Sequence, residues 1–336
     1  MKPVSAAGPA GPLLRDVGED GLVRAVLGRY RPPPASLLVP AGDDAAVLDV
    51  QGRVVVSTDT LVEGADFRRD WSTGADVGVK LAAQNLADVA AMGARPLALV
   101  VSLAAPPELE LAWATALADG LDAETARAGA AVAGGDVSQA AQLVLTGTAL
   151  GVLEGPAVLR SGARPGDVVA LAGRTGPSAA GLALLLASGS AAAAAGRSVS
   201  ASALVTAHVA PRPPYPAGPD AARAGATALI DTSDGLLRDA ARVAHAAGVV
   251  LDLDPTALAP PDDLVAAAEA LGDASLALSW VLTGGEDHAL LACFPPDADL
   301  PAPYTAVGRV LPAPDGPGVL VGGRPWSGPD GWHHFA

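Results

Sequence analysis

The stretch that decides the fold class is RVVVSTDTLVEG at 53–64, DVGVKLAAQNLADVAAM at 76–92 and PLALVVSL at 96–103. The first and third segments contain short runs of valine and leucine, which favour β-strands over 53–58 and 96–103. The middle segment spaces its apolar residues as a helix does and is followed by Gly93, a common helix terminator. A strand, a helix and a second strand in this order predict a layered α/β or α+β protein.

The same alternation continues along the chain and divides it into two parts. A length of 336 residues suits two domains, and residues 154–166 interrupt the pattern with proline, glycine and arginine. We therefore expect a short disordered extension at 1–15, an N-terminal domain at 16–155 and a C-terminal domain at 156–336. Further strands are expected at 130–133, 143–153, 167–172, 226–230, 248–253 and 287–294, further helices at 108–127, 177–187 and 235–247, and a loop at 211–219 (PRPPYPAGP).

Composition opposes several classes of protein. The chain has 21 Lys and Arg against 36 Asp and Glu, and a net charge of −15 opposes nucleic-acid binding, which needs a basic surface. The single cysteine, Cys293, excludes a disulfide framework and fits a reducing cytoplasm. Between Arg174 and Arg197 no residue is charged, but Ala, Gly and Ser dominate, so we expect a helix followed by an Ala-rich loop. Neither a nucleic-acid nor a membrane partner is expected.

Acidic residues gather beside Gly, Ser and Thr near the ends of predicted strands. Such a carboxylate is well placed to face a cleft, although Asp, Ser and Gly also form ordinary turns. Oxygen ligands of this kind suit Mg²⁺, which binds a few carboxylates together with phosphates and waters. The recurrence of the pattern favours metal binding over turns. The clusters are Gly42–Asp44, Ser57–Thr60, Gly134–Asp136, Asp231–Gly235 and Gly284–Asp287.

Two further features bear on phosphate chemistry. Asp76, Lys80, Gln84 and Asp88 share one face of the predicted helix, and Asp88 lies near its end, where it could face a cleft instead of solvent. The loop GRTGPS at 173–178 lies between a predicted strand and helix, and its N–H groups could bind an anion. The chain lacks a GxxxxGK[ST] loop, so any ATP that it handles is not held by a Walker motif.

Taken together, these motifs resemble those of the thiamine-monophosphate kinase family, part of an ATP-binding superfamily that includes aminoimidazole ribonucleotide synthetase. The resemblance runs from residue 17 to residue 335 in the family's order. The matching segments are GDDAAVL at 42–48, STDTLVEG at 57–64, KLAAQNLADVAAMGARP at 80–96, GGD at 134–136, RSGARPGDVVALAG at 160–173, DTSDGL at 231–236, GGEDHAL at 284–290 and GWHHF at 331–335.

The resemblance implies ATP-dependent phosphorylation of thiamine monophosphate to thiamine diphosphate, with several Mg²⁺ ions. Glu286 and Trp332 stand where the family contacts the thiamine moiety, and Asp66 stands at a substrate-contact position where the family usually has histidine. The implied nucleotide contacts are Gly135, Asp136, Arg160 and Ser233. The implied metal ligands are Asp44, Ser57, Thr58, Asp59, Asp88, Asp136, Asp231 and Asp234, among which Asp59, Asp88, Asp136 and Asp234 are the implied catalytic residues.

This chemistry suits the residues. A phosphate monoester is largely dianionic at neutral pH and needs no strong base, so the obstacle is repulsion between two anions. Divalent ions held by carboxylates would relieve that repulsion, with Arg160 and Lys80 as further sources of positive charge, and direct in-line transfer without a phosphoenzyme is expected. The resemblance also implies that the N-terminal domain binds metal and ATP, that the active site lies in the cleft between the domains, and that the enzyme is a cytoplasmic homodimer formed through N-terminal strands.

Two alternatives stay open. The first is another ATP-dependent enzyme of the same superfamily that acts on a different phosphorylated small molecule. Selenophosphate synthetase needs a reactive Cys or selenocysteine near its N-terminus and the hydrogenase-maturation member ends in cysteine, whereas this chain has only Cys293. The second alternative is a non-catalytic nucleotide-binding protein, which would not need so many carboxylates. Release of ADP from ATP and Mg²⁺ separates an enzyme from a binding protein.

Overall fold

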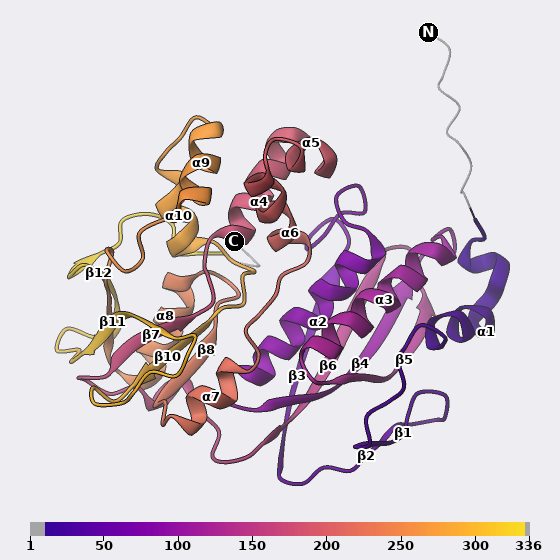
Figure 1. The fold of residues 1–336 in the computed structure, drawn as a ribbon, viewed down its shortest axis with the longest axis horizontal. Coiled ribbons are helices and arrows are strands. Elements are labelled where there is room, and N and C mark those ends of the chain that lie inside the picture. Colours follow the sequence, from indigo (N-terminus) through magenta and orange to yellow (C-terminus); the bar gives the residue numbers. More distant parts are fainter. Residues whose placement is uncertain (1–10, 333–336) are drawn as a thin grey trace. The chain divides into compact units, whose positions relative to one another are not determined.

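The computed structural model describes residues 11–332 and has the predicted mixed α/β class (Figure 1). Contacts between Cα atoms divide the chain into unit 1 (Met1–Asp49, Thr58–Ala82 and Ala98–Thr148) and unit 2 (Val50–Ser57, Ala83–Leu97 and Ala149–Ala336). Most of the predicted extension at 1–15 lies outside the described residues, but Leu14 and Arg15 already belong to helix α1 (Leu14–Leu27). The domain boundary near residue 155 stays a prediction.

The N-terminal half contains a four-stranded sheet in the order β3-β6-β4-β5. The predicted strands and helices of this half are confirmed to within a few residues, although β3 continues to Val62 and β5 to Gln139. A two-stranded ribbon of β1 and β2 precedes the sheet. The bounds are β1 (Leu37–Val39), β2 (Val47–Leu48), β3 (Arg53–Val62), α2 (Gly74–Ala90), β4 (Arg95–Ala105), α3 (Leu111–Arg127), β5 (Ala131–Gln139) and β6 (Val144–Leu153).

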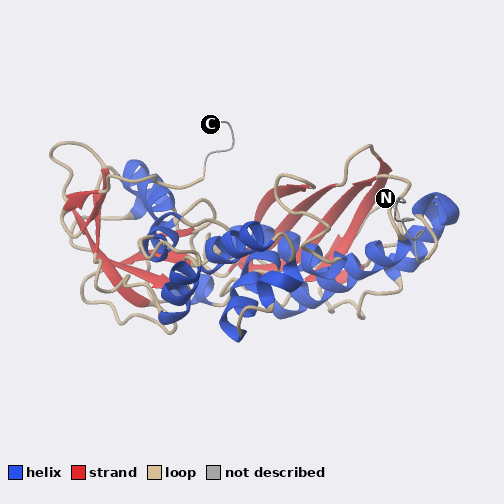
Figure 2. Ribbon diagram, turned by 90° about the horizontal axis from the view of Figure 1, so that it is seen from above, coloured by secondary structure: helices blue, strands red, loops and turns tan. Residues whose placement is uncertain are grey.

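Glycine lets the helices of unit 1 pack closely. A Cβ atom on Gly78 would collide with the carbonyl oxygen of Leu117, and one on Gly120 would collide with that of Ala75. The backbones of α2 and α3 therefore approach more closely than larger residues would permit. Figure 2 shows the helices of this unit along one face of its strands. Thr73 caps the start of α2, because Thr73 and Asp76 exchange hydrogen bonds as a capping box does.

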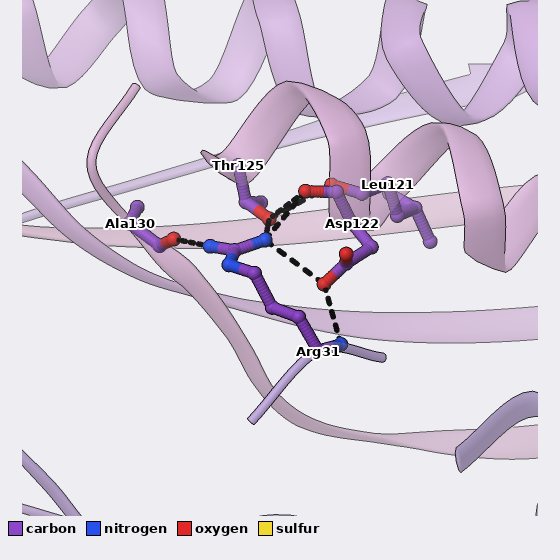
Figure 3. A network of polar contacts seen from close by, with 5 residues as sticks. All are labelled: Arg31, Leu121, Asp122, Thr125 and Ala130. Atoms are coloured by element: carbon purple, nitrogen blue, oxygen red, sulfur yellow. Dashed lines mark hydrogen bonds and ion pairs between the residues drawn. The ribbon is translucent and has the colours of Figure 1, made fainter. Parts of the chain in front are cut away.

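Arg31 fastens the segment after α1 to the rest of unit 1 (Figure 3). Its Nη1 donates to the carbonyl oxygen of Asp122 at 2.6 Å and to the Asp122 carboxylate at 2.9 Å. Its Nη2 donates to the carbonyl oxygen of Ala130, just before β5. One guanidinium group thus joins the α1–β1 connection to α3 and to the residue just before β5.

Unit 2 contains a seven-stranded sheet in the order β13-β12-β9-β11-β7-β10-β8. Its interior strand β10 is entirely buried, and Phe294 on that strand packs edge-on against Tyr304 with ring centroids 5.3 Å apart. Neighbouring strands are antiparallel except for β12 and β9. The bounds are β7 (Val168–Ala172), β8 (Ala228–Asp231), β9 (Val250–Leu253), β10 (Leu290–Phe294), β11 (Thr305–Leu311), β12 (Gly318–Val321) and β13 (Arg324–Pro325).

Two segments of unit 2 that were expected to be loops contain helices. The Ala-rich segment forms α5, because Ser190 Oγ accepts the N–H of Ala193 and Ala has the highest helix propensity. The proline-rich segment 211–219 becomes α7 at Ala217, because proline is tolerated in a first turn, where its missing N–H would be unpaired anyway. The bounds are η1 (Arg160–Gly162), α4 (Pro177–Ser188), α5 (Ala191–Ala195), α6 (Val199–Val209), α7 (Ala217–Arg223), α8 (Leu236–Ala247), α9 (Asp262–Ala270) and α10 (Leu276–Thr283).

Candidate active site

The turn between β8 and α8 carries the motif DTSDG. Strand β8 ends at Asp231, which is 3% exposed, and α8 begins at Leu236. Gly235 makes the turn possible: its φ is 120°, and a Cβ atom there would lie 2.6 Å from the carbonyl oxygen of Thr283. The acidic residues therefore lie at a strand end beside glycine, as the sequence predicts.

The motif GGEDHAL lies directly against this turn. The N–H of Glu286 donates to the carbonyl oxygen of Ser233 at 2.8 Å, and the N–H of His288 donates to that of Thr232 at 3.0 Å. These bonds extend the pairing of β10 with β8, in which Leu290 lies opposite Asp231. Two segments more than 50 residues apart in sequence are thereby held side by side within unit 2.

Trp332 reaches the same turn from the C-terminal segment. Its N–H donates to the carbonyl oxygen of Asp234 at 2.9 Å, while 62% of the residue's surface is exposed. Both residues implied to contact thiamine, Glu286 and Trp332, are thus bonded through their backbones to Ser233 and Asp234. The structure brings these four predicted site residues together.

A buried ion pair fixes the orientation of Asp231. Its Oδ2 lies 3.1 Å from His288 Nδ1, and His288 is 4% exposed. Burial alone would lower the pKa of His288, but the hydrogen bond and charge of Asp231, with smaller contributions from Glu286 and Asp88, raise it above its ordinary value. Asp88 and Glu286 therefore lie within electrostatic reach of the same imidazole.

Arginines of α8 surround Asp234. Arg242 is ion-paired with both Asp234 and Asp239, and Arg238 Nε lies 3.6 Å from Asp234 Oδ2. The N–H of Asp234 donates to Asp239 Oδ2 at 3.0 Å. Burial and then the charge of Asp231 raise the pKa of Asp239 to about 7. Arg238 and Arg242 lie one turn apart on α8, and their spacing of four and eight residues after Asp234 is the sequence signal that could have indicated this network.

Ser57 and Asp88 form a second pair of predicted ligands in unit 2. Ser57 Oγ donates to Asp88 Oδ2 at 2.7 Å, so the end of α2 does direct Asp88 towards another site residue. The predicted nucleotide contact Arg160 lies in η1 with an exposed side chain.

Two of the predicted ligands in unit 1 have hydrogen bonds within that unit. Thr58 Oγ1 donates to the carbonyl oxygen of Gly147 at 2.7 Å, and Asp136 Oδ2 accepts from Ser138 Oγ at 2.9 Å. Asp44, Asp59 and Asp136 are exposed. Gly135, predicted to contact the nucleotide, also has a structural reason to be glycine, since a Cβ atom there would collide with the carbonyl oxygen of Val101 on β4.

The segment around Asp66 is held by its own polar groups. Asp66 Oδ2 accepts the N–H of Val62 at 2.8 Å, which closes a turn after β3. Lys80 is 1% exposed, and its Nζ donates to the carbonyl oxygen of Asp66 at 3.0 Å. This ammonium group therefore fixes the segment that contains Asp66.

The donor set suits Mg²⁺, because every predicted metal ligand offers a carboxylate or hydroxyl oxygen. Within residues 11–332, no group of three His, Cys, Asp or Glu side chains has the arrangement of a metal site. The predicted ligands come from both units: Asp44, Thr58, Asp59 and Asp136 from unit 1, and Ser57, Asp88, Asp231 and Asp234 from unit 2.

The glycine-rich loop at 173–178 already binds an anion of the protein. The N–H groups of Gly176 and Ser178 donate to the carboxylate of Asp287 at 2.6 and 2.8 Å. Withdrawal from water raises the pKa of Asp287 to about 7, although these two bonds act against the rise. The expectation that this loop offers these N–H groups to an external anion is therefore wrong.

Four comparisons place the chain among known proteins. Residues 42–153 match the family model "AIR synthase related protein, N-terminal domain". A thiamine-monophosphate kinase of Mycobacterium tuberculosis is 48% identical over 329 residues, which cover 96% of this chain and 93% of the relative. The crystal structure of thiamine-monophosphate kinase from Stenotrophomonas maltophilia has a TM-score of 0.76 at 31% identity and covers 91% of this chain and 95% of its own. A structure of AaThiL complexed with AMPPCP and TMP has a TM-score of 0.75 at 29% identity. The match covers 97% of this chain and 100% of the AaThiL chain. The chain therefore belongs to the thiamine-monophosphate kinase family.

Proposed function

We infer that this chain catalyses the ATP-dependent phosphorylation of thiamine monophosphate to thiamine diphosphate. The observation that carries this inference is the 48% identity, over nearly the whole of both chains, to a thiamine-monophosphate kinase. The AaThiL structure, 29% identical to this chain, supports it with a complex that contains AMPPCP, an ATP analogue, and TMP.

The proposed site assigns a task to each group of residues. Gly135, Asp136, Arg160 and Ser233 contact the nucleotide. Glu286 and Trp332 contact the thiamine moiety, and Asp66 is a further substrate contact. Trp332 exposes its ring, which suits a cation–π contact with the thiazolium cation. The phosphate of the acceptor is itself the nucleophile, so no residue is required as a strong base.

Asp44, Ser57, Thr58, Asp59, Asp88, Asp136, Asp231 and Asp234 would hold Mg²⁺ ions. When bound, these ions supply positive charge that reduces the repulsion between donor and acceptor phosphates. The Ser57–Asp88 hydrogen bond and the His288–Asp231 ion pair orient three of these side chains beforehand. Asp59, Asp88, Asp136 and Asp234 are the proposed catalytic residues.

We also propose that the enzyme is a cytoplasmic homodimer. Val54 and Val56 on β3 are 48% and 61% exposed, and Val100 on β4 is 36% exposed. Exposed apolar residues on strands are typical of protein interfaces. Light scattering coupled to size-exclusion chromatography would test this proposal, because a monomeric mass at micromolar concentration would contradict it.

In the described residues, no helix combines the length and the apolar character needed to cross a bilayer.

Incubation with ATP, Mg²⁺ and either thiamine or thiamine monophosphate tests the activity. We expect thiamine diphosphate and ADP only from the monophosphate. Product from free thiamine would instead indicate a pyrophosphokinase. ATP binding without ADP release in the presence of either substrate would favour a non-catalytic nucleotide-binding protein or a superfamily member with another acceptor.

A further inference from the structure

The segment Glu286–His288 has an unusual backbone. Glu286 has a φ of 65° and His288 a φ of 51°, and among the described residues these are the non-glycine residues with positive φ. A side chain with a Cβ atom is strained in this region, so such a conformation persists only where the surroundings enforce it. Strain of this kind collects at functional sites, and here it brackets Asp287.

Asp287 supplies the enforcing contact. One carboxylate oxygen accepts the N–H of Gly176 at 2.6 Å and the other accepts the N–H of Ser178 at 2.8 Å. These N–H groups lie at the N-terminus of α4, where helix N–H groups have no partner within the helix and favour negative charge. Both oxygens of one side chain thus tie the segment to one helix end.

The same first turn of α4 also reaches Glu286. Ser178 Oγ lies 3.1 Å from His208 Nδ1, and His208 Nδ1 lies 3.3 Å from Glu286 Oε2. Ser178 and His208 are 0% and 6% exposed, so this chain of contacts is fixed by packing. Glu286 is therefore held on one side by its backbone neighbour Asp287 and on the other by His208.

We propose that Asp287 is a positioning residue, whose carboxylate clamps residue 287 to α4 and thereby presents the Glu286 side chain to the thiamine moiety. The proposal rests on the proposed function, because the contact between Glu286 and thiamine belongs to it. In this proposal Asp287 acts through the backbone and through Glu286, because its two oxygens accept the N–H groups of Gly176 and Ser178.

Asp287→Asn tests the clamp with little change in shape. The amide can accept one of the two N–H groups and opposes the other with its own NH₂ group. We expect the KM for thiamine monophosphate to rise about tenfold, with kcat reduced less and the KM for ATP changed less than about twofold. Calorimetry should show a matching loss of affinity for thiamine monophosphate. An unchanged KM and affinity for thiamine monophosphate would overturn the proposal.

Asp167→Asn is the matched control. Asp167 is 4% exposed and accepts the N–H of Arg164 at 2.9 Å and the hydroxyl of Thr227 at 2.6 Å. It precedes β7, whereas the Asp287 clamp lies beyond the other end of that strand, after Ala172. We expect the control to lose stability and to keep both KM values. Equal rises of the KM for thiamine monophosphate in both variants would overturn the proposal, since they would indicate general loosening.

Chemical rescue is a second test of the Asp287 clamp. Asp287 also lines a cavity of about 370 Å³, together with Arg174 and Arg212, which gives a small carboxylate access to the N–H groups of Gly176 and Ser178. We expect formate, but not chloride, to lower the raised KM of Asp287→Ala for thiamine monophosphate. Absence of any rescue would count against the carboxylate as the clamp. If the wild-type enzyme does not bind thiamine monophosphate, the proposed function fails and this inference fails with it. If the wild-type enzyme is active and the Asp287 variants keep its KM for thiamine monophosphate, only the inference fails.

Discussion

The predicted metal ligands of unit 1 and those of unit 2 differ in what surrounds their carboxylates. In unit 2, Asp231 and Asp234 are 3% and 8% exposed; Asp234 is ion-paired with Arg242, and Asp231 lies 3.1 Å from the imidazole of His288. In unit 1, Asp44, Asp59 and Asp136 are exposed. Buried carboxylates need paired charge, whereas exposed ones keep theirs in water. The chain thus orients the acids of unit 2 in advance and leaves those of unit 1 with negative charge that a cation can neutralise.

The largest effect should come from a carboxylate of unit 1. Asp59→Asn removes a proposed metal ligand and one negative charge, and we expect turnover to fall at least about 100-fold, because the metal compensates charge on both phosphates. The melting temperature should change by less than about 2 °C, since the side chain is exposed. Production of thiamine diphosphate and thermal unfolding measure the two effects.

Asp70→Asn is the matched control for this variant. Asp70 is an exposed carboxylate of unit 1 that accepts from Arg68 Nε at 2.9 Å. Its replacement should leave turnover within about twofold, because an exposed ion pair contributes little. Wild-type turnover in Asp59→Asn would remove Asp59 from the proposed site and weaken the distinction between the two units.

The next effect tests the protein cations of unit 2. Arg242→Met leaves Asp234 and the buried Asp239 without their shared guanidinium, and we expect the free energy of unfolding to fall by about 2 kcal/mol. Urea denaturation measures this loss. Arg223→Met is the comparison, since Arg223 is 58% exposed and pairs with the carboxylates of Glu154 and Asp220, which are 59% and 35% exposed, and it should cost less than about 1 kcal/mol. Equal losses would show that burial of the carboxylates does not govern their dependence on arginine.

Much of this architecture could be predicted from short-range patterns. The strands at 53–58 and 96–103 and the helix at 76–92 follow from local periodicity, and the structure confirms them. Helices α5 and α7 were missed because each depends on one local contact or position: the serine cap at Ser190, and prolines placed where a helix tolerates them. Composition alone suggests a loop in both segments.

The site was only partly predictable, because its decisive contacts join distant parts of the sequence. The motifs indicate which acids matter, but not that Glu286 bonds to Ser233 or that Trp332 bonds to Asp234. Nor could spacing show that the N–H groups of the loop at 173–178 are taken by Asp287, more than 100 residues away. Positive φ at Glu286 and His288 could not be predicted from the sequence, because few non-glycine residues adopt it and the contacts that enforce it here come from distant segments.

A smaller effect concerns pH and the carboxylate of Asp287. Its pKa is raised from 3.8 to about 7, so the folded protein holds this proton more tightly than the unfolded chain does. That contribution to stability is present below about pH 4 and is lost as the pH rises through about 7. Asp287→Asn should remove it, which changes the pH dependence of unfolding by about 1–2 kcal/mol once the partial exposure of the carboxyl is allowed for. Urea denaturation from pH 4 to pH 8 measures the difference between the two proteins, in which Asp239 contributes equally. Parallel curves would show that Asp287 titrates alike in the folded and unfolded states.

The smallest effect examines Asp66, the position where this chain departs from the family's histidine. Its Oδ2 accepts the N–H of Val62, and asparagine can accept that bond with its own oxygen, so Asp66→Asn keeps the turn and removes only the charge. Thiamine carries a cationic thiazolium ring, and loss of a nearby solvated negative charge should raise the KM for thiamine monophosphate about threefold, with stability changed by less than about 0.5 kcal/mol. Asp66→Ala, which loses the turn bond as well, should lower stability by about 1 kcal/mol more. A KM that rises in Asp66→Ala but not in Asp66→Asn would assign Asp66 to the turn alone and leave substrate recognition to Glu286 and Trp332, the two residues that unit 2 holds beside its buried acids.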